Sequence, residues 1–181
     1  MNTTTQNHFA LFGLPVSYEV DLNTLSEHYR ELQRTVHPDK FANASNQERR
    51  ISVQKAAQIN EAFQTLKSPI RRARYILEMR GVEFDDQRDN TVDPMFLMEQ
   101  IELREALAEI PKNDQGLMKL GSLQDDIQQK VQQLTSELGE LLSEDSDEAM
   151  NRAKSNLHKL QFMDKLQQEA ENVEEDIANS L

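Results

Sequence analysis

The sequence predicts an all-α protein, on three observations. Gly and Pro contribute only 5 residues each to the 181. Charged residues make up 29%, and long stretches of Leu, Glu, Gln, Lys and Ala favour helix over sheet. Apolar residues recur at steps of three and four in several stretches, which is the period of an amphipathic helix.

The net charge of −12 is divided unevenly along the chain. Residues 1–80 carry 11 Lys and Arg against 8 Asp and Glu, whereas residues 81–181 carry 9 against 24. Such a break favours two domains with different partners. The acidic half would repel phosphates, so we expect no nucleic-acid partner, although the basic half alone permits weak contact.

The chain contains no cysteine, which excludes disulfides, a thiol nucleophile and Cys-ligated zinc or iron–sulfur clusters of its own. Its N-terminus lacks the basic and apolar regions of a signal peptide, and no apolar run approaches membrane-spanning length. We therefore expect a cytoplasmic protein with no membrane contact. We also expect it to carry no cofactor or metal.

Four helices are predicted in the first half. A short one covers about 9–14, and Pro15 closes it. Asp21 caps the second, which must end before His37-Pro38 because the residue preceding proline leaves the helical region. After the polar loop DKFANASN, a third helix covers about 47–66 and forms a hairpin with the second. The fourth extends from Ser68-Pro69 to Arg80, with Gly81 as its C-cap. The apolar faces of the second and third helices are expected to hold Leu22, Leu25, Tyr29, Leu32 and Val36, and Val53, Ala56, Ile59, Phe63 and Leu66.

Residues 81–93 form an acidic segment without a helical period, which predicts a linker. Three helices are predicted after it, at about 94–110, 117–142 and 146–177, with the last two carrying the regular apolar seams of a helical bundle. The seams are Leu120, Ile127, Val131, Leu134, Leu138 and Leu141 on one helix, and Ala153, Leu157, Leu160, Met163, Leu166, Ala170, Val173 and Ile177 on the other.

A basic strip leads into the first interhelical loop. At roughly 100° per residue, Arg30 and Arg34 lie one turn apart on the face away from the apolar stripe. They precede a His and an Asp held by Pro38, an arrangement suited to docking on an acidic surface. The alternative is that the arginines merely pair with Glu27 and Glu31, which is worth a few tenths of a kcal/mol. With His37-Pro38-Asp39 adjoining them, we favour docking.

This pattern resembles the J-domain of the DnaJ family. The tripeptide alone is weak evidence, but here a helix ends at His37-Pro38-Asp39-Lys40-Phe41 and the next helix contains I-N-E-A-F-Q-T-L at 59–66. The resemblance implies that His37, Pro38 and Asp39, with Arg30, Arg34 and Lys40, engage a DnaK-class chaperone and trigger ATP hydrolysis there. The chain itself would then not be an enzyme. No nucleophile or metal-ligand cluster accompanies His37 and Asp39, and His28 and His158 are expected to be solvated.

The second half resembles the HscB family of J-domain co-chaperones. The Gly/Phe-rich linker and cysteine-rich module of general DnaJ proteins are absent. Instead, F-L-M-E-Q-I-E-L-R-E at 96–105 and L-Q-F-M-D-K-L at 160–166 match HscB. The missing N-terminal cysteine module of the eukaryotic relatives points to the bacterial branch. We expect a J-domain over 7–80, a linker over 81–93 and a three-helix bundle over 94–181.

The helix at 94–110 has two apolar faces. With Phe96 at 0°, Leu103, Leu107 and Ile110 fall within roughly 40° of it, whereas Leu97, Ile101 and Met98 lie on a second face at roughly 100–200°. Phe162 lies at the margin of its own seam. The second face is either buried packing or a partner site with an adaptable Met and a polar rim. With the resemblance added, we favour a client site of Leu97, Met98, Ile101 and Phe162, with Glu102, Arg104 and Glu105 less certain.

The resemblance implies a ternary function. The bundle holds an iron–sulfur scaffold protein of the IscU type while the J-domain stimulates the ATPase of the chaperone HscA, which promotes iron–sulfur protein maturation. Three alternatives stay open: a J-protein for another client, an enzyme using His37 and Asp39, and a nucleic-acid binder using the basic half.

Overall fold

The structure is a computed structural model that describes residues 7–41, 44–84 and 93–180, without the side chains of Pro38 and Asp39. No strand occurs within these ranges, and the prediction of an all-α fold is confirmed. The chain forms two compact units, 1–79 and 80–181, which are treated separately below. None of the helices described is long and apolar enough to cross a membrane.

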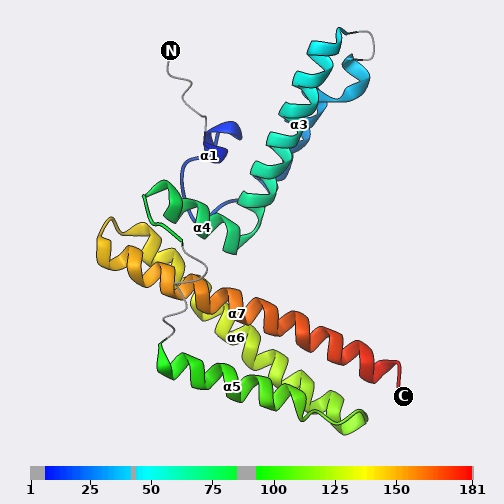
Figure 1. Ribbon diagram of the computed structural model, residues 1–181, viewed down its shortest axis with the longest axis vertical. Coiled ribbons are helices and arrows are strands. Elements are labelled where there is room, and N and C mark those ends of the chain that lie inside the picture. Colours follow the sequence, from blue (N-terminus) through cyan, green and yellow to red (C-terminus); the bar gives the residue numbers. More distant parts are fainter. Residues whose placement is uncertain (1–6, 42–43, 85–92, 181) are drawn as a thin grey trace. The chain divides into compact units, whose positions relative to one another are not determined.

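The first unit is built on an antiparallel hairpin of α2 (Leu22–Val36) and α3 (Asn46–Lys67), with α1 (His8–Leu11) and α4 (Pro69–Met79) packed on α3 (Figure 1). Asp21 caps α2 as predicted. Ser45 and Glu48 form a capping box on α3, which satisfies two free N–H groups reciprocally. A 3₁₀ turn, η1 (Pro38–Phe41), lies inside the segment expected to be a loop, and Ala42 and Asn43 lie outside the described residues.

The core of this unit differs from the predicted faces at both ends of the hairpin. Val53 is exposed and Ser52 is buried in its place, with its hydroxyl donating to the Arg49 carbonyl. Two successive steps of three residues separate Val53 from Ile59 and rotate it by about 120°, whereas Ser52 lies within about 20° of Ile59. Leu22, in the first turn of α2, is also half exposed. The buried set is Phe9, Phe12, Tyr18, Leu25, Val36, Ile59, Ala62, Leu66, Ala73, Ile76 and Leu77.

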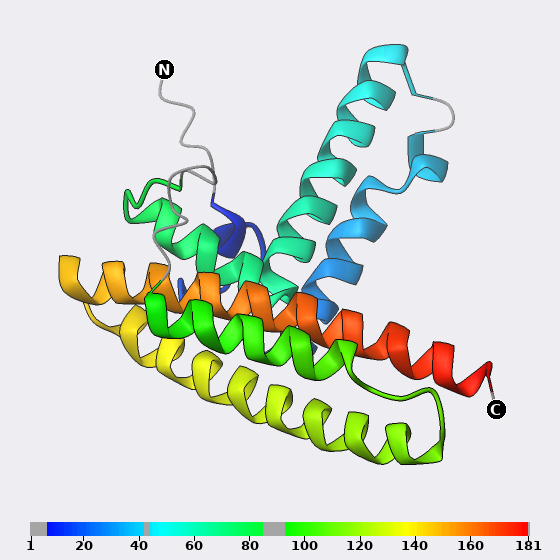
Figure 2. The same cartoon turned by 60° about the horizontal axis from the view of Figure 1, so that its bottom comes forward.

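The second unit is a bundle of α5 (Pro94–Ala108), α6 (Asp114–Ser143) and α7 (Asp147–Ala178). The long helices α6 and α7 lie side by side, and α5 runs along them (Figure 2). The predicted seams of both long helices are buried, with Val131 and Val173 partly so. Helix α6 begins three residues earlier than predicted because the Asn113 side chain accepts the Gly116 N–H as an N-cap.

The start of the expected linker is packed onto the bundle. Arg80 donates to the carbonyls of Leu142 and Glu144 at the end of α6, at 2.8 and 3.0 Å. These carbonyls have no partner within the helix, so a cation there complements the helix dipole. Lys154 donates to the Glu83 carbonyl at 2.7 Å and lies over the Phe84 ring. Residues 80–84 are therefore part of the second unit, and 85–92 lie outside the described residues.

Candidate interaction surfaces

The first surface is built at the end of α2. The backbone leaves the helix at His37 with φ −59° and ψ 134°, as expected for a residue before proline. The His37 carbonyl then accepts the Lys40 N–H at 3.0 Å and closes the turn of η1. The side chains of His37 and Lys40 are exposed, whereas those of Pro38 and Asp39 lie outside what the structure describes.

Arg30 and Arg34 lie on the exposed side of α2, one turn apart. Among the described residues, neither forms an ion pair with Glu27 or Glu31. The pairing that was the alternative to docking is therefore not made in this part of the chain. Both guanidinium groups are presented to solvent beside the turn at His37.

Side chains of the I-N-E-A-F stretch hold α2 in position, a role that the sequence analysis did not assign. The Phe63 ring stacks on Tyr29 with centroids 4.1 Å apart. The side-chain oxygen of Asn60, Oδ1, accepts from the Tyr29 hydroxyl at 2.7 Å and from the Gln33 side-chain amide at 2.6 Å. Because Tyr29 and Gln33 flank Arg30, these contacts determine which way the basic strip faces.

The second surface is on α5, whose inner side is anchored by Phe96 and Leu107, both buried. Leu103 and Ile110 are partly buried and pack against the same core, so the predicted bundle face of α5 does meet the bundle. On the other side, the side chains of Leu97, Met98 and Ile101 are 48%, 59% and 46% exposed. Four large apolar side chains, counting Met95, are thus open on one short helix. We call Leu97, Met98 and Ile101 the α5 patch.

Phe162, expected to be open with the α5 patch, is half covered. Its ring meets Phe96 edge-to-face, with centroids 5.6 Å apart and planes at 86°. The Arg104 guanidinium lies 5.4 Å from the centroid of the same ring and 3.7 Å from a Glu169 carboxylate oxygen. Phe162 therefore contributes to packing between α5 and α7 as well as bordering the surface. Glu102 and Glu105 are exposed.

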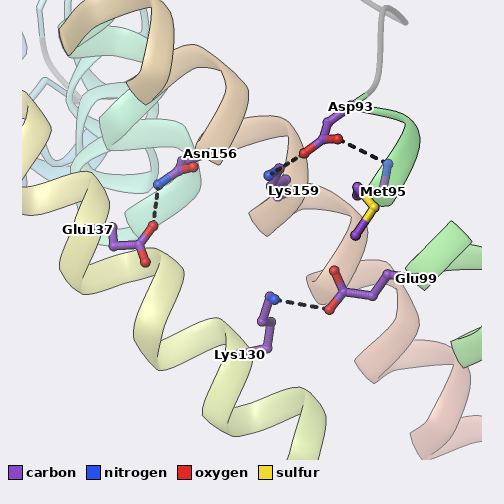
Figure 3. A network of polar contacts seen from close by, with 7 residues as sticks. All are labelled: Asp93, Met95, Glu99, Lys130, Glu137, Asn156 and Lys159. Carbon is purple, nitrogen blue, oxygen red and sulfur yellow. Dashed lines mark hydrogen bonds and ion pairs between the residues drawn. The ribbon is translucent and has the colours of Figure 1, made fainter. Parts of the chain in front are cut away.

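Polar contacts position α5 on the two long helices (Figure 3). Asp93 caps α5 by accepting the Met95 N–H at 3.0 Å, and its other oxygen pairs with Lys159 of α7 at 3.4 Å. Glu99 pairs with Lys130 of α6 at 3.0 Å. Exposed pairs of this kind contribute about 0–1 kcal/mol each, so they orient α5 more than they stabilise it.

Next to these contacts, Asn156 of α7 donates to Glu137 of α6 at 3.0 Å (Figure 3). The pKa of Glu137 lies below its ordinary value because its carboxylate accepts hydrogen bonds from Gln133, which has the larger effect, and from Asn156. A carboxylate bonded in this way stays charged at neutral pH. It therefore adds to the negative charge of the bundle.

Two histidines depart from the expected solvated state. The His28 Nδ1 lies 2.6 Å from the Phe12 carbonyl oxygen and is half buried, so it ties α2 to the segment after α1. His158 is also half buried, beside the Phe84 ring. Among the described residues, no group of three or more His, Cys, Asp or Glu side chains is placed to hold a metal ion.

The hairpin of α2 and α3, with the exposed His37 and the basic strip of Arg30 and Arg34 beside the connection between the helices, is the arrangement expected of a J-domain protein. Two family models match the chain: the DnaJ domain over residues 7–75 and the HSCB C-terminal oligomerisation domain over residues 92–171. The chain belongs to the HscB family of co-chaperones.

Similar proteins cover nearly the whole chain. It is 48% identical to a co-chaperone HscB homolog of Shewanella halifaxensis, over 93% of this chain and 97% of the relative. The structure of chaperone HscB from Vibrio cholerae matches with a TM-score of 0.85 at 40% identity, covering 94% of this chain and 99% of that one. The crystal structure of human co-chaperone protein HscB matches at 0.81 and 27% identity, covering 99% and 84%.

Proposed function

We propose that this protein binds an iron–sulfur scaffold protein of the IscU type through the α5 patch and delivers it to a DnaK-class chaperone, HscA, whose ATPase it stimulates. The observation that carries the proposal is the exposure of Leu97, Met98 and Ile101 on a helix whose opposite side is buried. A contiguous exposed apolar patch with polar residues around it is typical of a protein interaction site.

The composition of the α5 patch suits a protein client. A flexible Met beside Leu and Ile can adapt to an irregular apolar surface. Glu102, Glu105 and Arg104 are exposed around it, which gives the apolar centre and polar rim of a specific interface. Phe162, whose ring packs against Phe96, would form a rigid edge of the client site.

The chaperone contact is proposed for the surface at the end of α2. Arg30, Arg34 and Lys40 are exposed cations around the turn at His37, and such a group favours an acidic partner and a fast approach to it. In this scheme His37, Pro38 and Asp39 act on the partner's ATPase. The scheme requires no nucleotide on this chain.

Tethering would make the two contacts one function. Because the chaperone surface on the first unit and the α5 patch on the second belong to one chain, a bound scaffold is held at high effective concentration near the chaperone. Because one chain makes both the chaperone contact and the client contact, it favours stimulation of a chaperone molecule that is close to the bound client.

The test combines an ATPase assay and a titration. Purified HscA is assayed with this protein, with and without the scaffold, and the scaffold is titrated into this protein by calorimetry. Stimulation that grows with scaffold, together with direct scaffold binding, is the expected result. Stimulation with no scaffold binding would assign a different client, and no stimulation at all would overturn the chaperone assignment.

A further inference from the structure

The methionines of this chain divide into shielded and open ones. The sequence has seven, and Met1 lies outside the described residues. Met150 and Met163 are buried in the bundle, whereas Met95 and Met98 of α5 are 80% and 59% exposed. Met79 of α4 and Met118 of α6 are also open, at 42% and 72% exposure, but neither belongs to α5.

Met95 and Met98 are neighbours on the surface of α5. They are three residues apart in one helix, which places their side chains side by side. Met98 belongs to the α5 patch, and Met95 extends it toward the N-terminus of the helix. Both side chains are therefore largely exposed in the free protein, at a surface that a partner would bury.

We propose that Met95 and Met98 form a site of reversible oxidation by peroxides that switches off client binding. The inference rests on the proposed client site on α5. In the reaction the thioether sulfur attacks one peroxide oxygen, an S–O bond forms and the O–O bond breaks. The sulfur is oxidised by two electrons to the sulfoxide, and the peroxide is reduced to water or an alcohol.

Accessibility decides which methionines react. The chain has no cysteine, so no thiol of its own competes for the oxidant. Met150 and Met163 are shielded by the core, whereas Met95 and Met98 meet solvent directly. Mild oxidation is therefore expected at the open methionines, among which Met98 belongs to the α5 patch and Met95 adjoins it.

The sulfoxide changes binding without changing the fold. In the free protein its oxygen is hydrated, because both side chains are largely exposed, and no packing is lost. Under a bound client the same oxygen is a strong acceptor that must give up water in an apolar contact, which opposes association. We expect the dissociation constant for the scaffold to rise about tenfold or more.

The experiment oxidises this protein alone with hydrogen peroxide, removes the peroxide, and titrates the scaffold by calorimetry. Peptide mass spectrometry defines conditions under which Met95 and Met98 are oxidised while Met150 and Met163 are not. The expected result is a loss of scaffold affinity of about tenfold, an unchanged melting temperature, and recovery after treatment with methionine sulfoxide reductases.

Two variants assign the effect to the site. Each is compared with itself before and after oxidation, so its starting affinity does not matter. The double variant Met95→Leu, Met98→Leu should show no change in affinity after peroxide, whereas Met118→Leu should lose affinity as the wild type does. Equal scaffold affinity before and after verified oxidation of Met95 and Met98 would overturn the proposal. A wild-type protein that does not bind scaffold even before oxidation would instead overturn the proposed function.

Discussion

The edge-to-face contact between Phe96 and Phe162 joins the buried side of α5 to α7, with ring centroids 5.6 Å apart. Lys159 lies over the first ring and Arg104 over the second, each about 5.4 Å from the centroid. The two aromatic rings and two cations thus form a row of contacts along the α5–α7 boundary. Because Phe162 takes part in these contacts, it differs from Leu97, Met98 and Ile101, which are largely exposed.

Phe162→Ala should therefore reduce both stability and client binding. The side chain is half buried, so we expect a loss of about 1–3 kcal/mol in the free energy of unfolding, below the range for fully buried Phe. Denaturant melting measures this loss, and scaffold titration measures the second effect. The control Phe162→Leu keeps an apolar side chain and should lose less of both. Full stability of Phe162→Ala would show that the edge-to-face contact with Phe96 contributes little.

Leu97→Ala and Leu107→Ala should separate the two sides of α5. Leu107 is buried at 7% exposure, so its truncation should cost about 2–5 kcal/mol of stability. Leu97 is half exposed, so its truncation should lower the free energy of unfolding by less than about 0.5 kcal/mol. The same truncation should weaken scaffold binding by about 2 kcal/mol or more. Equal destabilisation with scaffold affinity intact in Leu97→Ala would place the client site elsewhere.

His37→Gln should abolish stimulation of the chaperone ATPase with little change in stability. The side chain is exposed at the end of α2, and surface substitutions of this kind stay within about 0.5 kcal/mol. Helix content and melting temperature serve as controls for the fold. A large fall in melting temperature would make His37 a structural residue, and full stimulation would remove it from the chaperone contact.

Arg30→Ala and Arg34→Ala should slow association with the chaperone more than they speed its dissociation. Exposed charges at an interface act mainly on the association rate, and their effect weakens as salt screens it. Surface plasmon resonance at several salt concentrations measures both rates. The matched control is Arg71→Ala, which removes the same charge from an arginine of α4 that is paired with Glu61. Rates that do not depend on salt would indicate an apolar chaperone contact.

His8 should make the first unit less stable in mild acid. The His8 ring stacks on the Tyr75 ring, with the ring centroids 4.3 Å apart. Burial lowers the pKa of His8 below 6.5, and Arg71 acts in the same direction against the opposing effect of Glu61. The unfolded chain then binds the proton more readily, so stability is full above pH 6.5 and falls as the pH drops toward the folded-state pKa.

The measurement for His8 is the melting temperature as a function of pH for the wild type and for His8→Phe, which retains an aromatic ring over Tyr75. The part of the acid destabilisation that is due to His8 should be missing from the variant. Identical pH profiles would show that the folded and unfolded pKa values of His8 are the same.

Local sequence signals determined the helices and their ends. Asp21 and Ser146 both cap helices, α2 and α7, where the sequence placed helix starts, because a cap acts through backbone groups two or three residues away. The seams of α6 and α7 are long enough that period alone identifies the buried side. The basic strip and the apolar second side of α5 were likewise visible from the sequence, although which of them binds a partner stays a prediction.

Tertiary structure decided what depends on residues far apart in the chain. Whether the second side of α5 is covered or open depends on what packs there, and periodicity is the same in both cases; the structure leaves Leu97, Met98 and Ile101 open. Phe162 is half covered because Phe96, 66 positions away, meets its ring. Likewise Lys154 and Arg80 hold residues 80–84 on the bundle through carbonyl groups that every residue carries. Side-chain type and spacing indicate where helices begin and end and which side is apolar, whereas these contacts arise only once the helices have packed.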